Sequence, residues 1–178
     1  MDCRLPDEDS PRSELIVRPA RAEDVRYLAD HLRCEDLAEI VAASNMDAYT
    51  AIGRGFVESV PRVTVEFRGK PAAMFGVVPT ENLESPRAGA IWLLGTDEID
   101  LFKTRFLRES AQWLEFATRN YDVVGNVVDE RNSKHVKWLK WLGFKFLRRI
   151  PQYGHLGLPF YEFVKVISEN CFTCAPRQ

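Results

Sequence analysis

Three side chains in this sequence could donate or accept protons and stand among apolar residues: Glu66, His135 and Tyr153. A carboxylate or an imidazole can take a proton from a reacting amine, and a phenol can give one to a leaving group. If the chain is an enzyme, these three residues are its candidate catalytic groups. The structural alternatives, which we favour, are that Glu66 belongs to an exposed strand face and that His135 is a structural histidine pointing into the core.

His135 lies in the segment NSKHVKWLKWLGFKF, which has the pattern of an amphipathic helix. At about 100° per residue, one face of this helix carries His135, Val136, Trp138, Leu139 and Leu142. Asn132 is placed to cap the start of the helix. Gly143 is placed to end it in the left-handed conformation, which glycine adopts at low cost.

The other face of this predicted helix carries Lys134, Lys137 and Lys140, with Trp141 directed among them. Trp141 could lie over the lysine stems on a solvated face. A lysine stripe that contains an aromatic ring could also dock an acidic protein or a nucleic acid. We take these four residues as the candidate interface, and we do not expect a nucleic-acid partner because the chain as a whole is not basic.

The four cysteines include a C-x-x-C pair, Cys171 and Cys174. Such a pair could bind zinc or cycle as a redox couple. A closed zinc site needs four ligands, and no second pair in the sequence has this spacing. We therefore interpret both residues as reduced thiols and predict no metal site.

The composition predicts one soluble domain. A chain of 178 residues with 46% apolar residues can form one full core, and its net charge of -2 gives no overall field towards nucleic acid or anionic lipid. No run approaches the roughly 20 apolar residues of a membrane helix. We expect a mobile arm at 1–14, a domain at 15–168 and a C-terminal tail at 169–178.

Hydrophobic periodicity predicts the order β-α-α-β-β-β-α-β-α-β-β. Strands are expected at 15–20, on both sides of an Arg68-Gly69-Lys70 turn within 62–79, at 88–96, 121–130, 145–150 and 159–166. Helices are expected at 22–32, 35–44 and 99–121, and from Asn132 onwards. The strand at 88–96 is apolar throughout, which is typical of a central strand.

This order, with IVRPARAEDV near its start and N-x-x-H-V-x-W-L-x-x-L-G-F near its end, resembles the GNAT family of acyl-CoA-dependent N-acyltransferases. The resemblance implies a single α+β domain with a mixed, mostly antiparallel sheet of about seven strands and about four helices. The stretches VRPARAED, WLLGTDEI, NSKHVKWLKWLGFKF and FYEFV more narrowly resemble the small internal virion proteins of short-tailed bacteriophages, the podoviruses. This resemblance implies the same fold and a role in head and core assembly.

The GNAT resemblance implies a pyrophosphate site at a glycine-bearing turn before the longest helix. The corresponding stretch, GTDEIDLFKTRF, has Gly95 as its only glycine and carries Asp97, Glu98 and Asp100, which oppose an anion. These acids are better explained as first-turn residues that stabilise the helix start, with Thr96 or Asp97 as the cap.

A second family feature is also missing. Many GNAT proteins carry a tyrosine seven residues after the asparagine, and it protonates the departing thiolate. Leu139 stands there in this chain, and leucine transfers no proton. Tyr153 is the candidate substitute.

These features lead to three hypotheses. The first is a non-catalytic bacteriophage protein on a GNAT-like fold, acting through contacts with other virion proteins either in virion assembly in the host cytoplasm or in the particle. No cofactor is expected in that case, and a homo-oligomer is left open. The alternative is an N-acetyltransferase that uses acetyl-CoA on a protein or small-molecule amine, and its candidate cofactor contacts are Leu94, Gly95, Thr96, Lys103 and Asn132. The third is a nucleic-acid-binding module.

Overall fold

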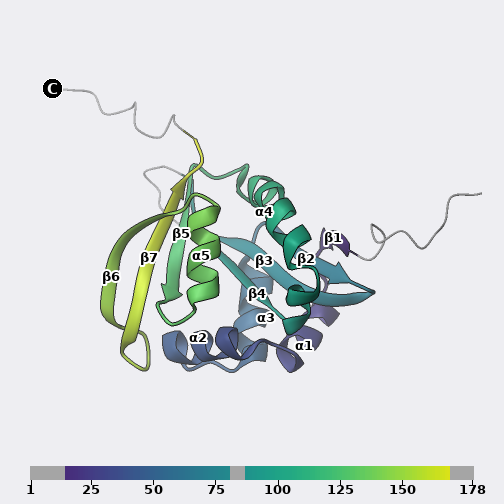
Figure 1. The fold of residues 1–178 in the computed structure, drawn as a ribbon, viewed down its shortest axis with the longest axis horizontal. Coiled ribbons are helices and arrows are strands. Elements are labelled where there is room, and N and C mark those ends of the chain that lie inside the picture. Colours follow the sequence, from purple (N-terminus) through teal and green to yellow (C-terminus); the bar gives the residue numbers. More distant parts are fainter. Residues whose placement is uncertain (1–14, 81–86, 169–178) are drawn as a thin grey trace, which may run out of the picture.

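A sheet of seven strands, in the order β1-β2-β3-β4-β5-β7-β6, forms the centre of the molecule (Figure 1). The computed structural model describes residues 15–80 and 87–168. The strands are β1 (Leu15–Pro19), β2 (Arg62–Phe67), β3 (Lys70–Thr80), β4 (Ala88–Gly95), β5 (Val123–Asp129), β6 (Lys145–Tyr153) and β7 (Leu158–Val166). Neighbouring strands run antiparallel except for the parallel pair β4 and β5. The predicted α+β class is confirmed, and β4 is the central strand.

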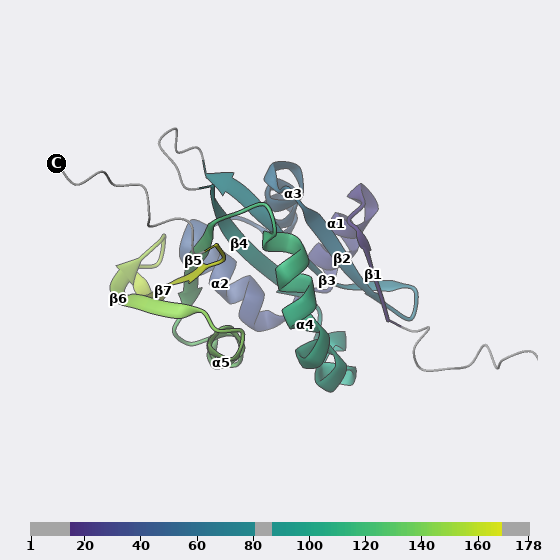
Figure 2. The ribbon, with the colours of Figure 1, turned by 90° about the horizontal axis from the view of Figure 1, so that it is seen from above.

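Helices cover both faces of the sheet. They are α1 (Ala22–Asp30), α2 (Cys34–Ser44), α3 (Ala48–Glu58), the 3-10 helix η1 (Asp97–Leu101), α4 (Lys103–Thr118) and α5 (Ser133–Trp141). Helices α1 to α3 lie on one face, and α4 and α5 lie on the other (Figures 1 and 2). Successive side chains of β3 point to opposite faces of the sheet and pack against different helices. Met74 packs with Leu28 of α1 and Ile52 of α3, whereas Phe75 packs in the same cluster as Phe106 of α4.

About four helices were expected, and the described residues form five α-helices because α3 was missed. Its sequence, AYTAIGRGFVE, contains Gly53 and Gly55, which weaken a helical pattern. Packing explains one of them: a Cβ at Gly55 would lie 2.7 Å from the ring of Trp92 on β4. Asp47 caps the helix by accepting a hydrogen bond from the Thr50 amide at 2.9 Å.

The single helix expected at 99–121 is two elements in the structure, η1 and α4. Phe102 lies between them and is buried. Thr96 holds the predicted N-cap position at the start of η1, with the acids in its first turn, but its side chain makes no capping hydrogen bond. The prediction was wrong for α4, where Phe102 holds the N-cap position and no side chain caps it. We attribute the interruption between η1 and α4 to the burial of Phe102 in the core. Helical periodicity alone does not reveal such an interruption.

A buried ion pair joins β1 to α1. Both guanidinium Nη atoms of Arg18 donate to the carboxylate of Asp24 at 2.7 and 2.8 Å, and Thr64 and the Arg21 amide donate to the same carboxylate. Burial favours a higher pKa for Asp24, but these hydrogen bonds hold its pKa below the usual value. Arg18 also pairs with Glu66 at 2.7 Å. The VRPARAED motif therefore has a structural role here.

The β6–β7 hairpin closes the end of α2. The amides of His155 and Leu156 donate to the carbonyls of Ala43 and Ala42 at 3.2 and 3.1 Å, which supplies partners for orphan helix-end carbonyls. Gly154 has φ of +66°, and a Cβ there would lie 2.5 Å from the Ala42 and Ala43 backbone. The turn and the helix end therefore fit together only with glycine at this position.

Substituting Gly154 tests this contact. We expect Gly154→Ala to cost roughly 2–4 kcal/mol of unfolding free energy, because a left-handed backbone and a clash act together. Gly157→Ala is the matched control, since Gly157 has φ of +60° with nothing within 4 Å of its Cβ position. We expect that control to cost about 1 kcal/mol. Urea unfolding measures the free energy of unfolding of both variants. Equal losses would show that the hairpin can move away from α2 without an energetic penalty.

Candidate active site

The parallel strands β4 and β5 separate soon after they meet. They pair at three positions, Ala88 with Val123, Gly89 with Val124 and Ala90 with Gly125. Beyond Ala90 the strand ladder stops, and the amide nitrogen Nδ2 of Asn126 bridges the gap by donating to the Ile91 carbonyl at 2.9 Å. The facing edges of the two strands are therefore open over the second half of β4.

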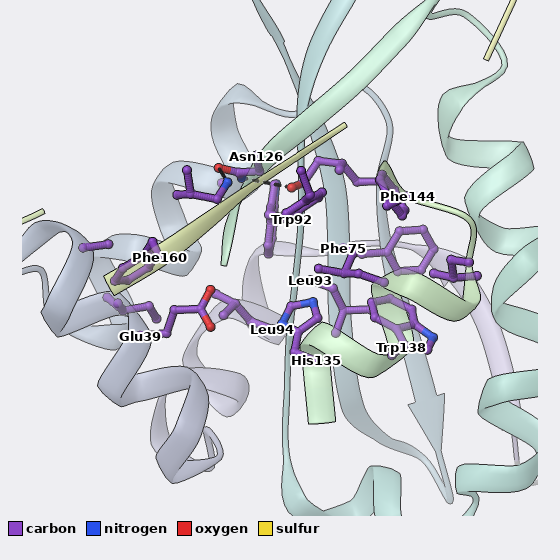
Figure 3. Close-up of a pocket in the computed structure, with 18 of the residues that line it drawn as sticks. Glu39, Phe75, Trp92, Leu93, Leu94, Asn126, His135, Trp138, Phe144 and Phe160 are labelled. Carbon is purple, nitrogen blue, oxygen red and sulfur yellow. Dashed lines mark hydrogen bonds between the residues drawn. The ribbon is translucent and has the colours of Figure 1, made fainter. Parts of the chain in front are cut away.

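A cavity of about 280 Å³ occupies this wedge. It is lined by residues from both helical layers, including Glu39 on α2, Gly55 on α3, Trp113 on α4 and His135 on α5. Most of its wall is aromatic or aliphatic, as Figure 3 shows for Phe75, Trp92, Leu93, Trp138, Phe144 and Phe160. An apolar wall with few polar groups is typical of a small-molecule site.

Glu39 carries the only carboxylate among the described residues that line this cavity. Its side chain points into the cavity (Figure 3) and accepts a hydrogen bond from Asn132 Nδ2 at 3.1 Å. Burial raises the pKa of Glu39 to about 8, helped by the nearby carboxylates of Asp36 and Asp129. A carboxyl group with this pKa is mostly protonated at pH 7 and ionises near pH 8, so both forms are accessible close to neutral pH.

His135 lines the cavity beside Glu39 (Figure 3). Burial lowers its pKa to about 4, so the imidazole is neutral at neutral pH. Its ring lies 5.4 Å from the Trp138 ring, and among the described residues it has no hydrogen-bond partner. The helix is built as predicted: Asn132 caps it through the His135 amide, Val136 and Leu139 are buried, and Gly143 has φ of +82°.

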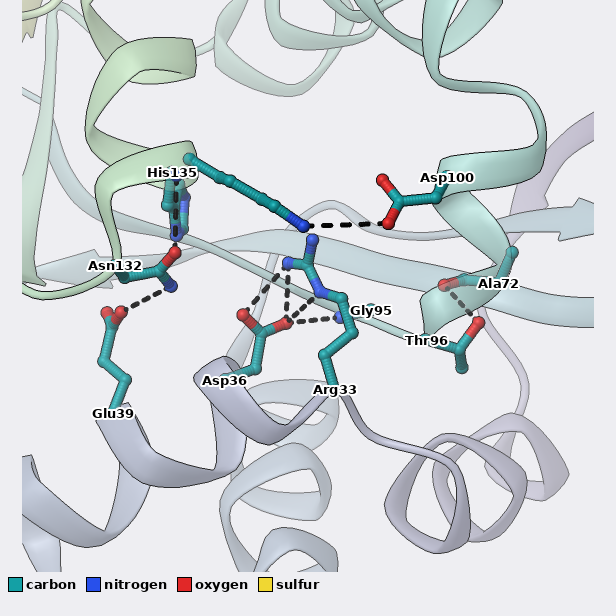
Figure 4. A network of polar contacts seen from close by, with 10 residues as sticks. Arg33, Asp36, Glu39, Ala72, Gly95, Thr96, Asp100, Asn132 and His135 are labelled. Carbon is teal, nitrogen blue, oxygen red and sulfur yellow. Dashed lines mark hydrogen bonds and ion pairs between the residues drawn. The ribbon is translucent and has the colours of Figure 1, made fainter.

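The carboxylate of Asp36, on α2, reaches the end of β4 (Figure 4). This carboxylate is 1% exposed, pairs with Arg33 at 2.9 Å and accepts the Gly95 amide at 2.9 Å. The Thr96 amide donates to the Ala72 carbonyl at 2.8 Å. Both backbone donors at the end of β4 are therefore used inside the protein.

Solved structures with the same fold include acetyltransferases, some of them described as members of the GNAT family. The GNAT acetyltransferase from Streptococcus pneumoniae superposes with a TM-score of 0.60 at 15% identity, over 87% of this chain and 100% of that one. YncA from Salmonella typhimurium, solved with its cofactor acetyl-CoA, gives 0.64 at 14% identity, over 92% and 98%. This chain has the GNAT fold. Ribosomal-protein-alanine N-acetyltransferase from Brucella melitensis gives 0.61 at 14% identity, over 85% and 99%.

At these identities the likeness establishes the fold. No protein-family model and no curated protein sequence matches the chain. The GNAT part of the predicted resemblance is thus confirmed at the level of fold, and nothing in these matches supports its podovirus part. None of the described helices is long and apolar enough to cross a membrane.

Acyl-CoA fits one part of this GNAT fold and not another. The open edge of β4, with Leu94 in the cavity wall, can pair with an amide-bearing arm. The turn after β4 does not suit a diphosphate, because the Gly95 and Thr96 amides are already bonded and Asp97 and Asp100 are exposed beside them. Lys103 is exposed at the α4 start, and Lys134 pairs with Asp100 at 3.7 Å.

The structure brings four of the predicted site residues to the cavity or its edge. Leu94, His135 and Tyr153 line it, and Asn132 holds Glu39. Glu66 lies on β2, outside the cavity wall, where it is half-buried and paired with Arg18; the expectation of an exposed face was therefore wrong. No group of three His, Cys, Asp or Glu side chains within 15–80 and 87–168 could hold a metal ion.

The sequence interpretation missed Glu39 and Asp36. Both lie on α2 at a spacing of three residues, and Ile40 on the same side of the helix is buried. Two acids beside the apolar stripe of a helix were the available signal, because such a position places charge against the core.

The candidate interface residues remain at the surface. Lys134, Lys137 and Lys140 are exposed, and Trp141 is 56% exposed. Lys140 lies 5.3 Å from the Phe146 ring. Trp141 also borders a shallow groove with Ala111, Glu115 and Val166. Cys34 is a free, exposed thiol, and the predicted Cys171 and Cys174 pair lies outside the described residues, as do the arm and the tail.

Proposed function

We propose that this chain is an N-acyltransferase that moves an acyl group from a thioester on a pantetheine-like arm, as in acetyl-CoA, to an amine. The observation that carries the proposal is the cavity at the split between β4 and β5, with Glu39 inside it. The cavity opens the free edge of a strand to a ligand and brings a proton acceptor to the same place. The GNAT fold alone would not suffice, since folds host unrelated functions.

Binding of the donor would use the backbone of β4. Between Ile91 and Leu94 the strand has no ladder partner on its β5 side. An extended chain with amide groups can pair with such an edge as an added strand would. The aromatic wall beside it excludes water from the thioester. The bound donor supplies the acyl group, and the chain supplies orientation and proton transfer.

Glu39 is the proposed proton acceptor. An amine reacts only when neutral, and a general base works best when its pKa lies near the working pH. The pKa of about 8 for Glu39 meets this condition. His135, with its lowered pKa, is the weaker base. The phenol of Tyr153 in the cavity wall is the proposed proton donor to the departing thiolate, in the place of the absent tyrosine at Leu139.

The proposal predicts a particular pattern of donor use. Because the turn after β4 offers no free donor at Gly95 or Thr96, the diphosphate of acetyl-CoA should add little affinity. We expect S-acetyl-pantetheine and acetyl-CoA to have KM values within about threefold, a difference of less than about 1 kcal/mol. Steady-state kinetics with the two donors measures this, and a hundredfold preference for acetyl-CoA would show a diphosphate site elsewhere.

The direct test is product formation from either donor with a panel of amines, followed by mass spectrometry. We expect Glu39→Gln to lower kcat/KM by about 10² or more, the usual contribution of a general base. Glu35→Gln, one turn earlier on α2 and exposed to solvent, should retain full activity. Absence of any acylated product would refute the enzymatic proposal, and full activity of Glu39→Gln would remove Glu39 from it.

The turn after β4 favours a second candidate function. An occupied Gly95 amide and adjoining acids suit a protein that has kept the fold without the nucleotide. That candidate is a non-catalytic virion-assembly protein of a bacteriophage, contacting other virion proteins through Lys134, Lys137, Lys140 and Trp141. Co-purification with virion proteins from infected cells, lost in Trp141→Ala, would support it. A chain that acylates amines and is absent from such complexes would refute it.

A further inference from the structure

We infer that the acceptor in this site is a primary amine with one positive charge on a compact aromatic or aliphatic body. The inference rests on the proposed acyl transfer and specifies its second substrate. It follows from what lines the cavity on the side of α2 and α3.

That side of the cavity combines one carboxylate with apolar surfaces. Figure 3 shows the oxygens of Glu39 turned into the cavity, whose wall also includes Phe160. Trp92 adds a ring whose polar atom is already satisfied, because its Nε1 donates to Ser59 Oγ at 2.8 Å. A close fit against Gly55 fixes the position of this ring. An ammonium group could therefore pair with Glu39 while its carbon body contacts the rings.

A bound ammonium favours ionisation of Glu39, and the resulting carboxylate provides for one cation and no more. Asp36 is paired with Arg33 at 2.9 Å, and Asp129 with Arg131 at 2.6 Å. The cavity wall described holds no second carboxylate, and its one basic side chain, His135, is neutral near pH 7. A second ammonium on the same ligand would be buried without a counter-ion, which is strongly unfavourable. A polyamine is thus a poor fit.

Size sets a second limit. The cavity of about 280 Å³ is bounded near α2 by the β6–β7 hairpin, which is bonded to Ala42 and Ala43. A cavity of about 150 Å³ in another protein holds one benzene molecule. The space therefore accommodates one ring with a short amine chain and the acyl end of the donor.

Ligand binding without any donor tests this assignment. The probes are 2-phenylethylamine, its neutral analogue 2-phenylethanol, and spermidine, measured by calorimetry and by the fluorescence of the cavity tryptophans Trp92, Trp113 and Trp138. We expect 2-phenylethylamine to bind at least tenfold more tightly than either of the other two. In Glu39→Gln the tenfold preference for the amine over the alcohol should vanish, whereas Glu35→Gln should keep it.

The outcomes separate the two claims. Equal or tighter binding of spermidine, or an unchanged preference in Glu39→Gln, would overturn the monoamine assignment. Tight, Glu39-dependent binding of 2-phenylethylamine supports the assignment even if no acyl transfer follows, in which case only the proposed enzymatic function fails. Acylation of spermidine but not of 2-phenylethylamine would uphold the enzyme and overturn the assignment.

Discussion

Replacing Asp24 by alanine is expected to lower the free energy of unfolding by about 3–5 kcal/mol. The carboxylate is 2% exposed and accepts hydrogen bonds from Arg18, Thr64 and the Arg21 amide. Removing it leaves the half-buried guanidinium of Arg18 with Glu66 as its remaining acidic partner. It also leaves the hydroxyl of Thr64 without this acceptor, and unpaired buried groups account for most of such losses. Urea unfolding monitored by circular dichroism measures the effect.

An exposed ion pair provides the control. Asp30→Ala breaks the Arg26–Asp30 pair on the same helix, where the two side chains are 75% and 55% exposed. We expect that loss to stay below about 0.5 kcal/mol. If Asp24→Ala cost no more than Asp30→Ala, the pairing of α1 with β1 through Arg18 would not contribute to stability. The stabilisation lost in Asp24→Ala should change little in about 1 M salt, because the Arg18–Asp24 pair is shielded from solvent.

Replacing Glu39 by glutamine is expected to make the protein more stable at alkaline pH. The pKa of Glu39 in the fold is about 8, above its value of 4.5 without the fold. Near pH 4 the carboxyl is protonated in both states and contributes no difference. Between these pKa values unfolding releases a proton, so the free energy of unfolding falls as pH rises, and the loss is complete above pH 8.

Glutamine cannot ionise, and its amide oxygen can still accept from Asn132. The variant should therefore match the wild type near pH 4 and exceed it by about 1–3 kcal/mol at pH 9, a range reduced from the full shift because water can enter the cavity. Urea unfolding at pH 4, 7 and 9 measures this difference. Glu35→Gln should follow the wild-type curve at each pH. Parallel curves for Glu39→Gln and the wild type would show that the carboxyl titrates normally.

Features that depend on neighbouring residues were predictable from the sequence. The cap at Asn132, the left-handed Gly143 and the buried and exposed faces of α5 follow from local spacing, and all are present. The Arg68-Gly69 turn is also confirmed, with φ of +50° and +76°. These features are determined by residues that lie within one or two turns of each other in the sequence.

Features that depend on distant partners were not predictable in this way. Gly55 is tolerated within α3 because the ring of Trp92 packs where a side chain would otherwise lie. Asp36 can be buried because Arg33 neutralises its charge and the Gly95 amide donates a hydrogen bond to it. Glu39 becomes a site residue only because β4 and β5 separate above it. In each case a deciding partner is remote in sequence, so a pattern within one segment carries no information about it.

The short pairing of β4 with β5 divides the sheet into two parts. Strands β1 to β4 form one half-sheet and β5, β7 and β6 form another, joined in the sheet at three residue pairs and by the Asn126–Ile91 bond. Few strand hydrogen bonds therefore hold the two half-sheets together along this line. A ligand seated in the wedge would contact both half-sheets and add to those bonds. We therefore expect amide exchange in β4 and β5 to slow together on binding.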